Sequence, residues 1–259
     1  MKNLLKITTI VLATLFLVSC AEKEEILSEN ETEFSPVTDS YALGLLENFG
    51  FDIKNYDVYE NEDGFLVEDD IIISHDHLVL NDDPETEQRR WKYKLDCKHF
   101  PIRIKFDKKV PKEWKDATIK ACVSWNKVSP VADKKGKKIN FFKTVSSKED
   151  VKIKYVELPD YNKNAYASAK LPSSSNKAQS PIKINKKKGT PKSKMEALMV
   201  HELGHVLGLH HTNKDDYGSS RIKDTPHRDS KSALNIGDLT DKLSKYDVKA
   251  IQKLYRDCD

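Results

Sequence analysis

Five residues in the last quarter of the chain have types and spacing that could bind a metal ion and activate water. His201 and His205 stand four positions apart, so on a helix they project from one face and can bind one Zn²⁺ through neutral imidazole nitrogens. Glu202 lies beside them, where it could act as general base on zinc-bound water rather than as a ligand. Gly208 can end the helix in a left-handed conformation and so return His211 as a third ligand. Three protein ligands leave one position open, which is typical of a catalytic zinc ion.

The run His201–His211 follows the pattern H-E-x-x-H-x-x-G-x-x-H and resembles the zinc motif of the metzincin clan of metallopeptidases. His210 adjoins the third histidine, but only His211 has the spacing of the motif. The resemblance implies a zinc-dependent endopeptidase that cleaves proteins or peptides outside the cytoplasm. It also implies an α+β fold, with a twisted mixed β-sheet, two main helices above a zinc cleft and a small C-terminal subdomain ending in a helix.

Other short segments resemble the dual-action HEIGH metallopeptidase family within that clan. The chain has Thr212 directly after the zinc motif, then Thr225-Pro226 and Asp229-x-x-Ser232 before a final helix. Upstream, the run Phe65–Ile71 is similar to a Val-Glu-Gly-Asp-Ile segment of such proteins, with Asp69 in place of the glycine.

One position departs from the metzincin pattern. The resemblance implies a methionine in a tight turn beneath the metal, and Leu234 stands there in the segment Ser232–Asn235. Leucine nearly conserves the volume of methionine, so we expect a cost below about 1.5 kcal/mol and retained zinc binding. Ile236 stands where some metzincins carry an additional tyrosine ligand.

The hydrophobic periodicity predicts three helices around this motif. The zinc helix should cover about Lys192–Leu209. Apolar residues at spacings of three and four from Trp114 to Val128 predict a second helix that opens after Pro111. A third should begin at Ser244, whose side chain can cap the helix together with Asp247.

Strands are predicted where apolar residues alternate with polar ones. This pattern occurs at Ile102–Phe106, at Val151–Tyr155 and at Ile182–Ile184. The apolar run Phe65–Ile73 is predicted as one further strand. We expect Ala165–Leu171 to be an edge strand that binds an extended substrate by β-augmentation.

Charge divides the chain into two parts. The 259 residues are 38% hydrophobic with a mean hydropathy of -0.65, which excludes a polytopic membrane protein. Residues 21–90 contain 21 acidic and 4 basic side chains, whereas residues 91–259 contain 20 acidic and 38 basic ones. With polar breaks near residue 90, this predicts an N-terminal region at 41–90 and a metzincin-like catalytic domain at 91–259.

The acidic N-terminal region suggests a prosegment held on the basic domain by charge. Asp69, Asp70 or Asp76 could then occupy the open zinc position, and the dibasic pair Arg89-Arg90 would suit an activating cleavage. The alternative is a folded N-terminal lobe without an inhibitory role.

The first twenty residues have the features of an export signal. Lys2 and Lys6 precede an apolar stretch of 13 residues, Ile7–Ser19, which is too short for a stable membrane span. Its end resembles the bacterial lipobox, which implies a signal peptide at 1–19, a lipid on Cys20 and an acidic tether at 20–40. We therefore expect a lipid-anchored protein of the bacterial cell envelope, at the outer membrane or cell surface, or one released after processing.

Export to an oxidising compartment would leave Cys97, Cys122 and Cys258 able to form one disulfide by three alternative pairings. None of the cysteines has the C-x-x-C spacing of a zinc or redox motif.

Two other functions remain open from the sequence. Lysine-rich runs at 134–138 and 186–188 could make the chain a module that binds anionic polymers, although no nucleic-acid motif accompanies them and no nucleic-acid partner is expected. Alternatively, the missing turn methionine would suit a zinc-bearing surface lipoprotein without catalysis. We expect a monomer in each case.

Overall fold

The computed structural model describes residues 33–75, 88–158, 165–212, 220–226 and 228–258, and Thr32–Asp259 forms one compact unit. Among the described residues, the main sheet has nine strands in the order β1-β2-β3-β4-β9-β10-β8-β6-β7. Within the described residues, none of the helices is both long and apolar enough to span a bilayer. The expected signal peptide and Cys20 lie outside the described residues.

The C-terminal half of the sheet contains the strands that alternation predicts. β6 (Ile102–Phe106), β8 (Val151–Val156) and β10 (Ile182–Asn185) pair in parallel, and β7 (Phe142–Thr144) extends β6 on its far side. β9 (Ala167–Lys170) runs antiparallel to β10. The sheet is therefore mixed, and together with the helices it confirms the α+β class.

Residues 33–75, here called the N-terminal lobe, supply the other half of the sheet. β1 (Ser35–Pro36) and helix α1 (Ser40–Asn48) precede β2 (Tyr59–Asn61), β3 (Gly64–Val67) and β4 (Ile71–Ile73), and the last three strands form an antiparallel meander.

The prediction of one strand over Phe65–Ile73 is wrong, because the run folds into two strands joined by a tight turn. Glu68 and Asp69 occupy the left-handed region with φ of 51° and 70°, which reverses the chain between β3 and β4.

The prediction of an edge strand at Ala165–Leu171 is half right. The strand is there as β9, but β4 pairs with it in parallel, with Ile71 opposite Ala169. Within residues 91–259 β9 would be the edge, and the N-terminal lobe covers it in the whole chain. The periodicity of residues 165–171 alone carries no signal for a partner strand about 100 residues upstream.

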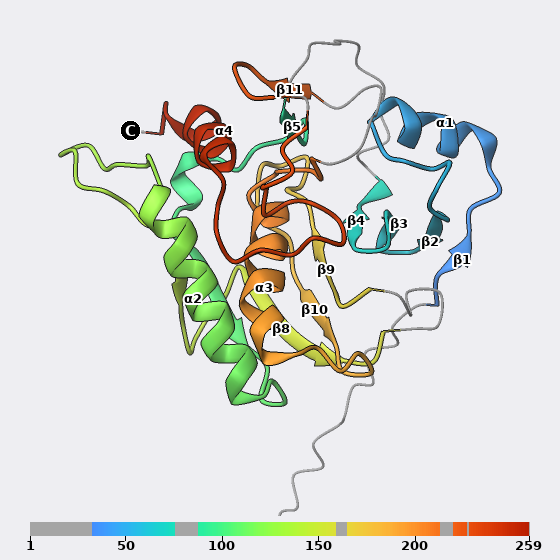
Figure 1. Ribbon diagram of the computed structural model, residues 1–259, viewed down its shortest axis with the longest axis horizontal. Helices are drawn as coiled ribbons and strands as arrows, with labels where there is room; N and C mark the ends of the chain where they lie inside the picture. Colours follow the sequence, from blue (N-terminus) through green and yellow to red (C-terminus); the bar gives the residue numbers. More distant parts are fainter. Residues whose placement is uncertain (1–32, 76–87, 159–164, 213–219, 227, 259) are drawn as a thin grey trace, which may run out of the picture. The chain divides into compact units, whose positions relative to one another are not determined.

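The three predicted helices are present. α2 (Lys112–Val128) and α3 (Lys192–Val206) lie side by side against the sheet (Figure 1), and α4 (Lys245–Tyr255) begins with the capping box of Ser244 and Asp247. α3 is three residues shorter than predicted, because Gly208 has a φ of 85° and closes the helix.

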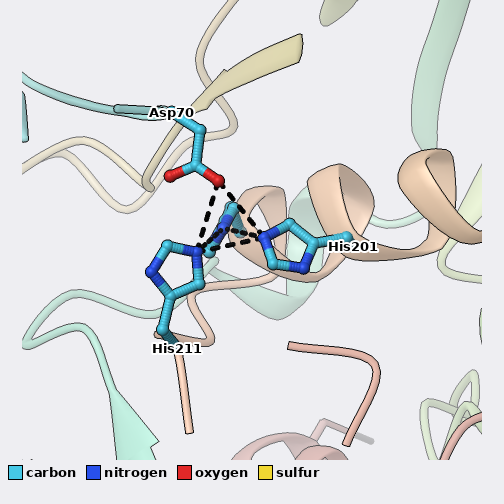
Figure 2. Close-up of side chains that lie close together, drawn as sticks. Asp70, His201 and His211 are labelled. Atoms are coloured by element: carbon cyan, nitrogen blue, oxygen red, sulfur yellow. Dashed lines mark hydrogen bonds and ion pairs between the residues drawn. The ribbon is translucent and has the colours of Figure 1, made fainter. Parts of the chain in front are cut away.

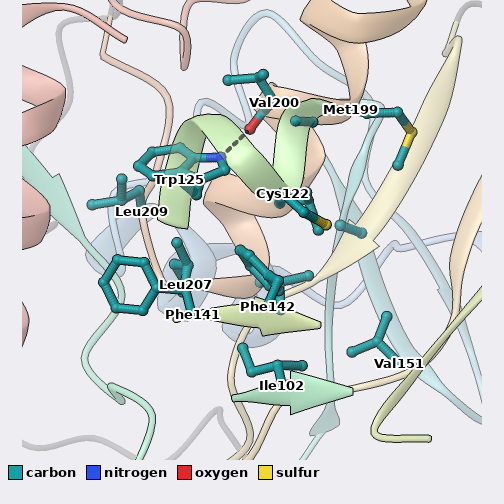
Figure 3. Close-up of a cluster of buried hydrophobic side chains, with 14 of the residues drawn as sticks. Ile102, Cys122, Trp125, Phe141, Phe142, Val151, Met199, Val200, Leu207 and Leu209 are labelled. Atoms are coloured by element: carbon teal, nitrogen blue, oxygen red, sulfur yellow. Dashed lines mark hydrogen bonds between the residues drawn. The ribbon is translucent and has the colours of Figure 1, made fainter. Parts of the chain in front are cut away.

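Three apolar clusters lie in the described part of the chain, and the two larger ones pack the sheet against its surroundings. The larger lies between the sheet and helices α2 and α3, where Trp125 donates from its indole nitrogen to the carbonyl of Val200 at 2.9 Å (Figure 3). The smaller joins the N-terminal lobe to Trp91 and Leu171.

A disulfide and a small second sheet link segments of the C-terminal part. Of the three pairings left open by the sequence, the structure forms Cys97–Cys258 and leaves Cys122 as a buried thiol. A separate two-stranded sheet pairs β5 (Gln88–Arg90), which contains the dibasic pair, with β11 (Ser220–Ile222).

Candidate zinc site

Helix α3 and the turn that follows it present three histidines to one point. His201 and His205 lie one helical turn apart on α3, and both are buried. The chain leaves the helix at Gly208, whose amide donates to the His205 carbonyl at 2.8 Å. Its left-handed conformation turns the chain so that His211 returns to the same point.

The facing ring nitrogens of these histidines form a compact triangle. The Nε2 atoms of His201 and His211 are 3.0 Å apart, those of His205 and His201 are 3.0 Å apart, and those of His205 and His211 are 3.1 Å apart. Donor atoms at these separations fit a single ion at the Zn–N distance of about 2.0–2.1 Å.

The opposite nitrogen of each ring has a partner that leaves Nε2 free to face a metal. Nδ1 of His201 contacts the carbonyl of Ala233 at 2.9 Å, and Nδ1 of His205 contacts the carbonyl of Leu209 at 2.8 Å. Because a carbonyl oxygen can only accept, it selects the tautomer with the proton on Nδ1. Nδ1 of His211 contacts the Glu68 carboxylate at 2.6 Å. Such partners are typical of zinc-binding histidines.

A carboxylate from the N-terminal lobe completes the cluster. Asp70 Oδ2 lies 3.4 Å from Nε2 of His201 and 3.4 Å from Nε2 of His211 (Figure 2). The four donor groups, Asp70 with the three histidines, all lie within 4.8 Å of one another. Of the three aspartates considered in the sequence, Asp70 is therefore the one in the cluster, Asp69 lies in the adjoining turn, and Asp76 is outside the described residues.

The electrostatics of the cluster are dominated by burial and by these carboxylates. Burial, and then the neighbouring His201 and His211, hold the pKa of His205 well below its usual value. Burial alone would also lower the pKa of His211, but Asp70 and Glu68 raise it to about 9. Burial opposes the charge on Asp70, yet the facing histidines, His211 foremost, bring its pKa below the usual range.

Glu202 lies on α3 beside the cluster and is fully buried. Neither of its carboxylate oxygens has a hydrogen-bond partner among the described residues. Burial, and then the charge of Asp70, raise the pKa of Glu202 well above its usual value. Within the described part of the chain, this carboxyl group is thus free of hydrogen bonds and lies next to the donor set.

The segment Ser232–Asn235 forms the turn beneath the site, with Leu234 fully buried against α3. A Cβ atom at Gly204 would lie 2.9 Å from Leu234 Cδ1, so the bare backbone at Gly204 makes room for the leucine. Thr212 donates from its hydroxyl to the Asn235 side chain at 2.8 Å, which ties the end of the zinc motif to this turn.

The other histidines lie elsewhere. His210 is buried against Trp91 and Phe51, with ring centroids 5.7 Å and 4.9 Å away, and it is not part of the donor cluster. His75 is exposed and contacts Glu60, while His77 and His227 fall outside the described residues. Glu68 was missed by the sequence argument, although the upstream resemblance runs through it.

A cavity of about 200 Å³ opens beside the cluster. Its walls come from α3, from the turn after Leu234, from the start of β9 and from the N-terminal lobe, and include Leu198, Glu202, Ile236, Tyr166 and Asp70. The turn residues Glu68, Asp69 and Asp70 line this cavity on the side of the lobe.

The chain is similar to one protein family and to several solved structures. Residues 91–256 match the family model of the matrixins. No curated protein matches the chain significantly. Among solved structures, one of myroilysin is similar to it at 13% identity and a TM-score of 0.43, covering 60% of this chain and 80% of the other. High choriolytic enzyme 1, a hatching enzyme zinc-protease from the medaka fish Oryzias latipes, is similar at 14% identity and a TM-score of 0.39, covering 60% and 88%.

The fold and the donor set define a zinc metallopeptidase of the metzincin type, and the cluster of His201, His205, His211 and Asp70 fits its one catalytic zinc ion. The family match spans well over half of the sequence, so the chain belongs to the matrixin family. This assignment rests on the family match rather than on the structural similarities. Proteins or peptides are accordingly its substrates.

Proposed function

We propose that His201, His205 and His211 hold the zinc ion and that Glu202 is the general base of an endopeptidase. The observation that carries this proposal is the triangle of Nε2 atoms 3.0–3.1 Å apart, with each Nδ1 bound on its far side. A bound zinc ion supplies a Lewis acid that lowers the pKa of water and polarises the scissile carbonyl.

The chain's own residues then supply proton transfer and substrate binding. Glu202, whose carboxylate oxygens have no hydrogen-bond partner among the described residues, accepts a proton from the attacking water and delivers it to the leaving amine. The cavity beside Leu198 and Ile236 receives an apolar side chain next to the scissile bond.

Replacing Glu202 by glutamine tests the assignment. In a chain whose Asp70 is replaced by alanine, we expect Glu202→Gln to keep one zinc ion per chain and to lose chelator-sensitive cleavage of a denatured protein by a factor of about 10² or more, because an amide cannot accept the proton. Metal content is measured by elemental analysis and cleavage by the appearance of new N-termini. Unchanged cleavage by the variant would refute the role of Glu202.

We also propose that the N-terminal lobe keeps the site latent, with Asp70 in the fourth position around the metal. Two features of the lobe support this. Asp70 Oδ2 faces two of the histidines at 3.4 Å, and the turn Glu68–Asp70 forms one wall of the cavity beside them. A cut near Arg89-Arg90, at the end of the acidic region, would be a step towards activation.

The proposed site of action is the bacterial cell envelope, with the chain anchored by a lipid on Cys20. The support is in the sequence, where a charged start and a short apolar run lead to Leu17-Val18-Ser19-Cys20. Thr212 and Thr225-Pro226 likewise favour a place near the dual-action HEIGH family within the clan.

Replacing Cys20 by alanine should move the protein from the membrane fraction to the soluble fraction and abolish incorporation of labelled fatty acid, because the acceptor thiol is gone. Fractionation of expressing cells followed by immunoblotting measures the location, and label in the immunoprecipitated protein measures acylation. Ser19→Gly, which keeps a small residue before the thiol, serves as a comparison. Membrane association that survives Cys20→Ala would rule out the anchor.

A further inference from the structure

The N-terminal lobe contributes a second carboxylate to the site, on the far side of His211 from Asp70. Glu68 is buried, and its Oε2 lies 2.6 Å from Nδ1 of His211, which follows it by 143 positions. Its other oxygen, Oε1, accepts from the backbone amide of Asp52 at 2.9 Å. We propose that Glu68 is a positioning residue that holds His211 in the orientation and tautomer required for zinc, so that the lobe forms part of the metal site.

His211 differs from the other two ligands in the origin of its support. His201 and His205 are held by the carbonyls of Ala233 and Leu209, which belong to the same part of the chain as the zinc motif. His211 is held by a carboxylate from the lobe. A charge-assisted hydrogen bond is roughly twice as strong as a neutral one, and a carboxylate partner raises the basicity of an imidazole ligand.

One turn of the lobe reaches both nitrogens of the same ring. Glu68 contacts Nδ1 and Asp70 lies 3.4 Å from Nε2. In this turn the backbone is left-handed at Glu68 and at Asp69. Residues other than glycine seldom adopt this conformation, and they keep it where contacts with the surrounding structure stabilise it. The turn is anchored on its other side by the contact between Glu68 and Asp52.

The two carboxylates therefore act in opposite directions. Asp70 takes up a position that substrate needs, whereas Glu68 supports a ligand that zinc needs. Moving the lobe away would open the site and at the same time loosen its third ligand. This inference rests on the proposed zinc ligands, and it predicts that metal retention and latency can be separated by point mutations in one turn.

The test uses the full chain and Glu68→Gln, which preserves the size of the side chain. The Asp52 amide and His211 reach different oxygens of the carboxylate, and glutamine replaces one of these oxygens by an NH₂ group, so it cannot accept from both. Zinc transfer to a chromophoric chelator should show affinity reduced about 10- to 100-fold. The visible bands of the Co²⁺-loaded chain should shift as well, which a purely structural role would not cause. Glu62→Gln, an exposed carboxylate of the same lobe, should behave as the wild type.

Wild-type zinc affinity together with an unchanged Co²⁺ spectrum in Glu68→Gln would overturn the inference. His205→Ala separates this from a failure of the proposed function, because zinc retained by His205→Ala would place the metal elsewhere. If Glu68→Gln does not fold, the zinc-loaded wild-type chain gives the answer by NMR. A slowly exchanging proton on Nδ1 of His211 is expected there, and its absence would refute the role of Glu68.

Discussion

At the residue scale, the contact that most affects access to the histidines is the one made by Asp70. Its Oδ2 faces His201 and His211 while Oδ1 has no partner among the described residues, so the side chain is held mainly by the cluster itself. A carboxylate in this place competes with water and with a scissile carbonyl for the fourth position.

Asp70→Ala in the full chain should therefore raise chelator-sensitive peptide cleavage. We expect a rise of about tenfold or more, since removing a competitor worth about 1.4 kcal/mol changes a rate tenfold. Initial rates on a fluorogenic peptide measure the effect. Glu62→Gln is the matched control on the exposed face of the lobe. An Asp70→Ala chain no faster than this control would contradict the proposal that Asp70 keeps the site latent.

The sequence indicates these residues unequally. The spacing of His201, His205 and His211 follows from helix geometry and one left-handed glycine, so local rules bring them together. Asp70 is one of three aspartates with equal claim, because local patterns do not show which of them reaches the cluster. The role of Glu68 is not predicted, because its hydrogen-bond partner is His211 and only the tertiary fold brings the two residues together.

At the element scale, helix α4 is connected to the zinc helix through the turn Ser232–Asn235. Asp247 accepts from the Ser232 hydroxyl at 2.6 Å and from the Ala233 amide at 2.9 Å, while it also caps α4 through the Ser244 amide at 2.8 Å. The Ala233 carbonyl in turn binds His201. The capping residue of the last helix thus also fixes the support of a proposed zinc ligand.

Asp247→Asn should lower the free energy of unfolding by about 1–3 kcal/mol, because one amide oxygen cannot satisfy three buried donors and the amide hydrogens would face them. The midpoint of urea denaturation, followed by circular dichroism, measures the change. Asp241→Asn, at an exposed position just before α4, should leave the midpoint unchanged. Equal midpoints for the two variants would show that the turn does not depend on Asp247.

Helices and strands whose apolar residues recur at a regular spacing are predicted well. Elements whose conformation depends on contacts with a distant part of the chain are not. α2, α4, β6, β8 and β10 follow their apolar spacing, and the capping box at Ser244 is present. The segment Phe65–Ile73 is predicted wrongly, because its apolar residues indicate a single strand. The left-handed turn at Glu68 and Asp69 contains no glycine, so the sequence does not show that the chain reverses there.

At the scale of the whole molecule, the lobe and the zinc-bearing part share both a sheet and a core. β4 pairs with β9, and the apolar cluster of the lobe includes Trp91, which donates from its indole nitrogen to the Pro172 carbonyl at 3.0 Å. Burial of such a cluster is a stronger attachment than exposed ion pairs provide.

A cut introduced by an engineered protease site between Ser74 and Gln88 should therefore leave the two pieces together. We expect co-elution on size exclusion in native buffer at physiological salt, and also at 1 M salt, because apolar burial is not screened. The two pieces should separate only on a denaturing gel. Elution of a free lobe after the cut would show that the shared sheet and core do not hold it.

The opposite charges of residues 21–90 and 91–259 indicate that these two parts attract one another. The structure shows which contacts join their described residues. One inter-part ion pair is Lys170 with Asp63 at 3.3 Å, but strand pairing and the cluster around Trp91 make the larger contact. The pairing of β4 with β9 depends on the tertiary fold, and the charge composition of the two parts does not predict which strands pair. The boundary expected near residue 90 stays a prediction.

We propose that one zinc ion on His201, His205 and His211 makes this chain cleave peptide bonds with Glu202 as base. The most direct measurement incubates zinc-loaded Asp70→Ala chain with a denatured protein library and identifies new N-termini by mass spectrometry, using the Asp70→Ala/Glu202→Gln chain as blank. We predict about one zinc per chain in both and chelator-sensitive cleavage only with Glu202 intact. One zinc per chain with no cleavage above the blank would contradict the account.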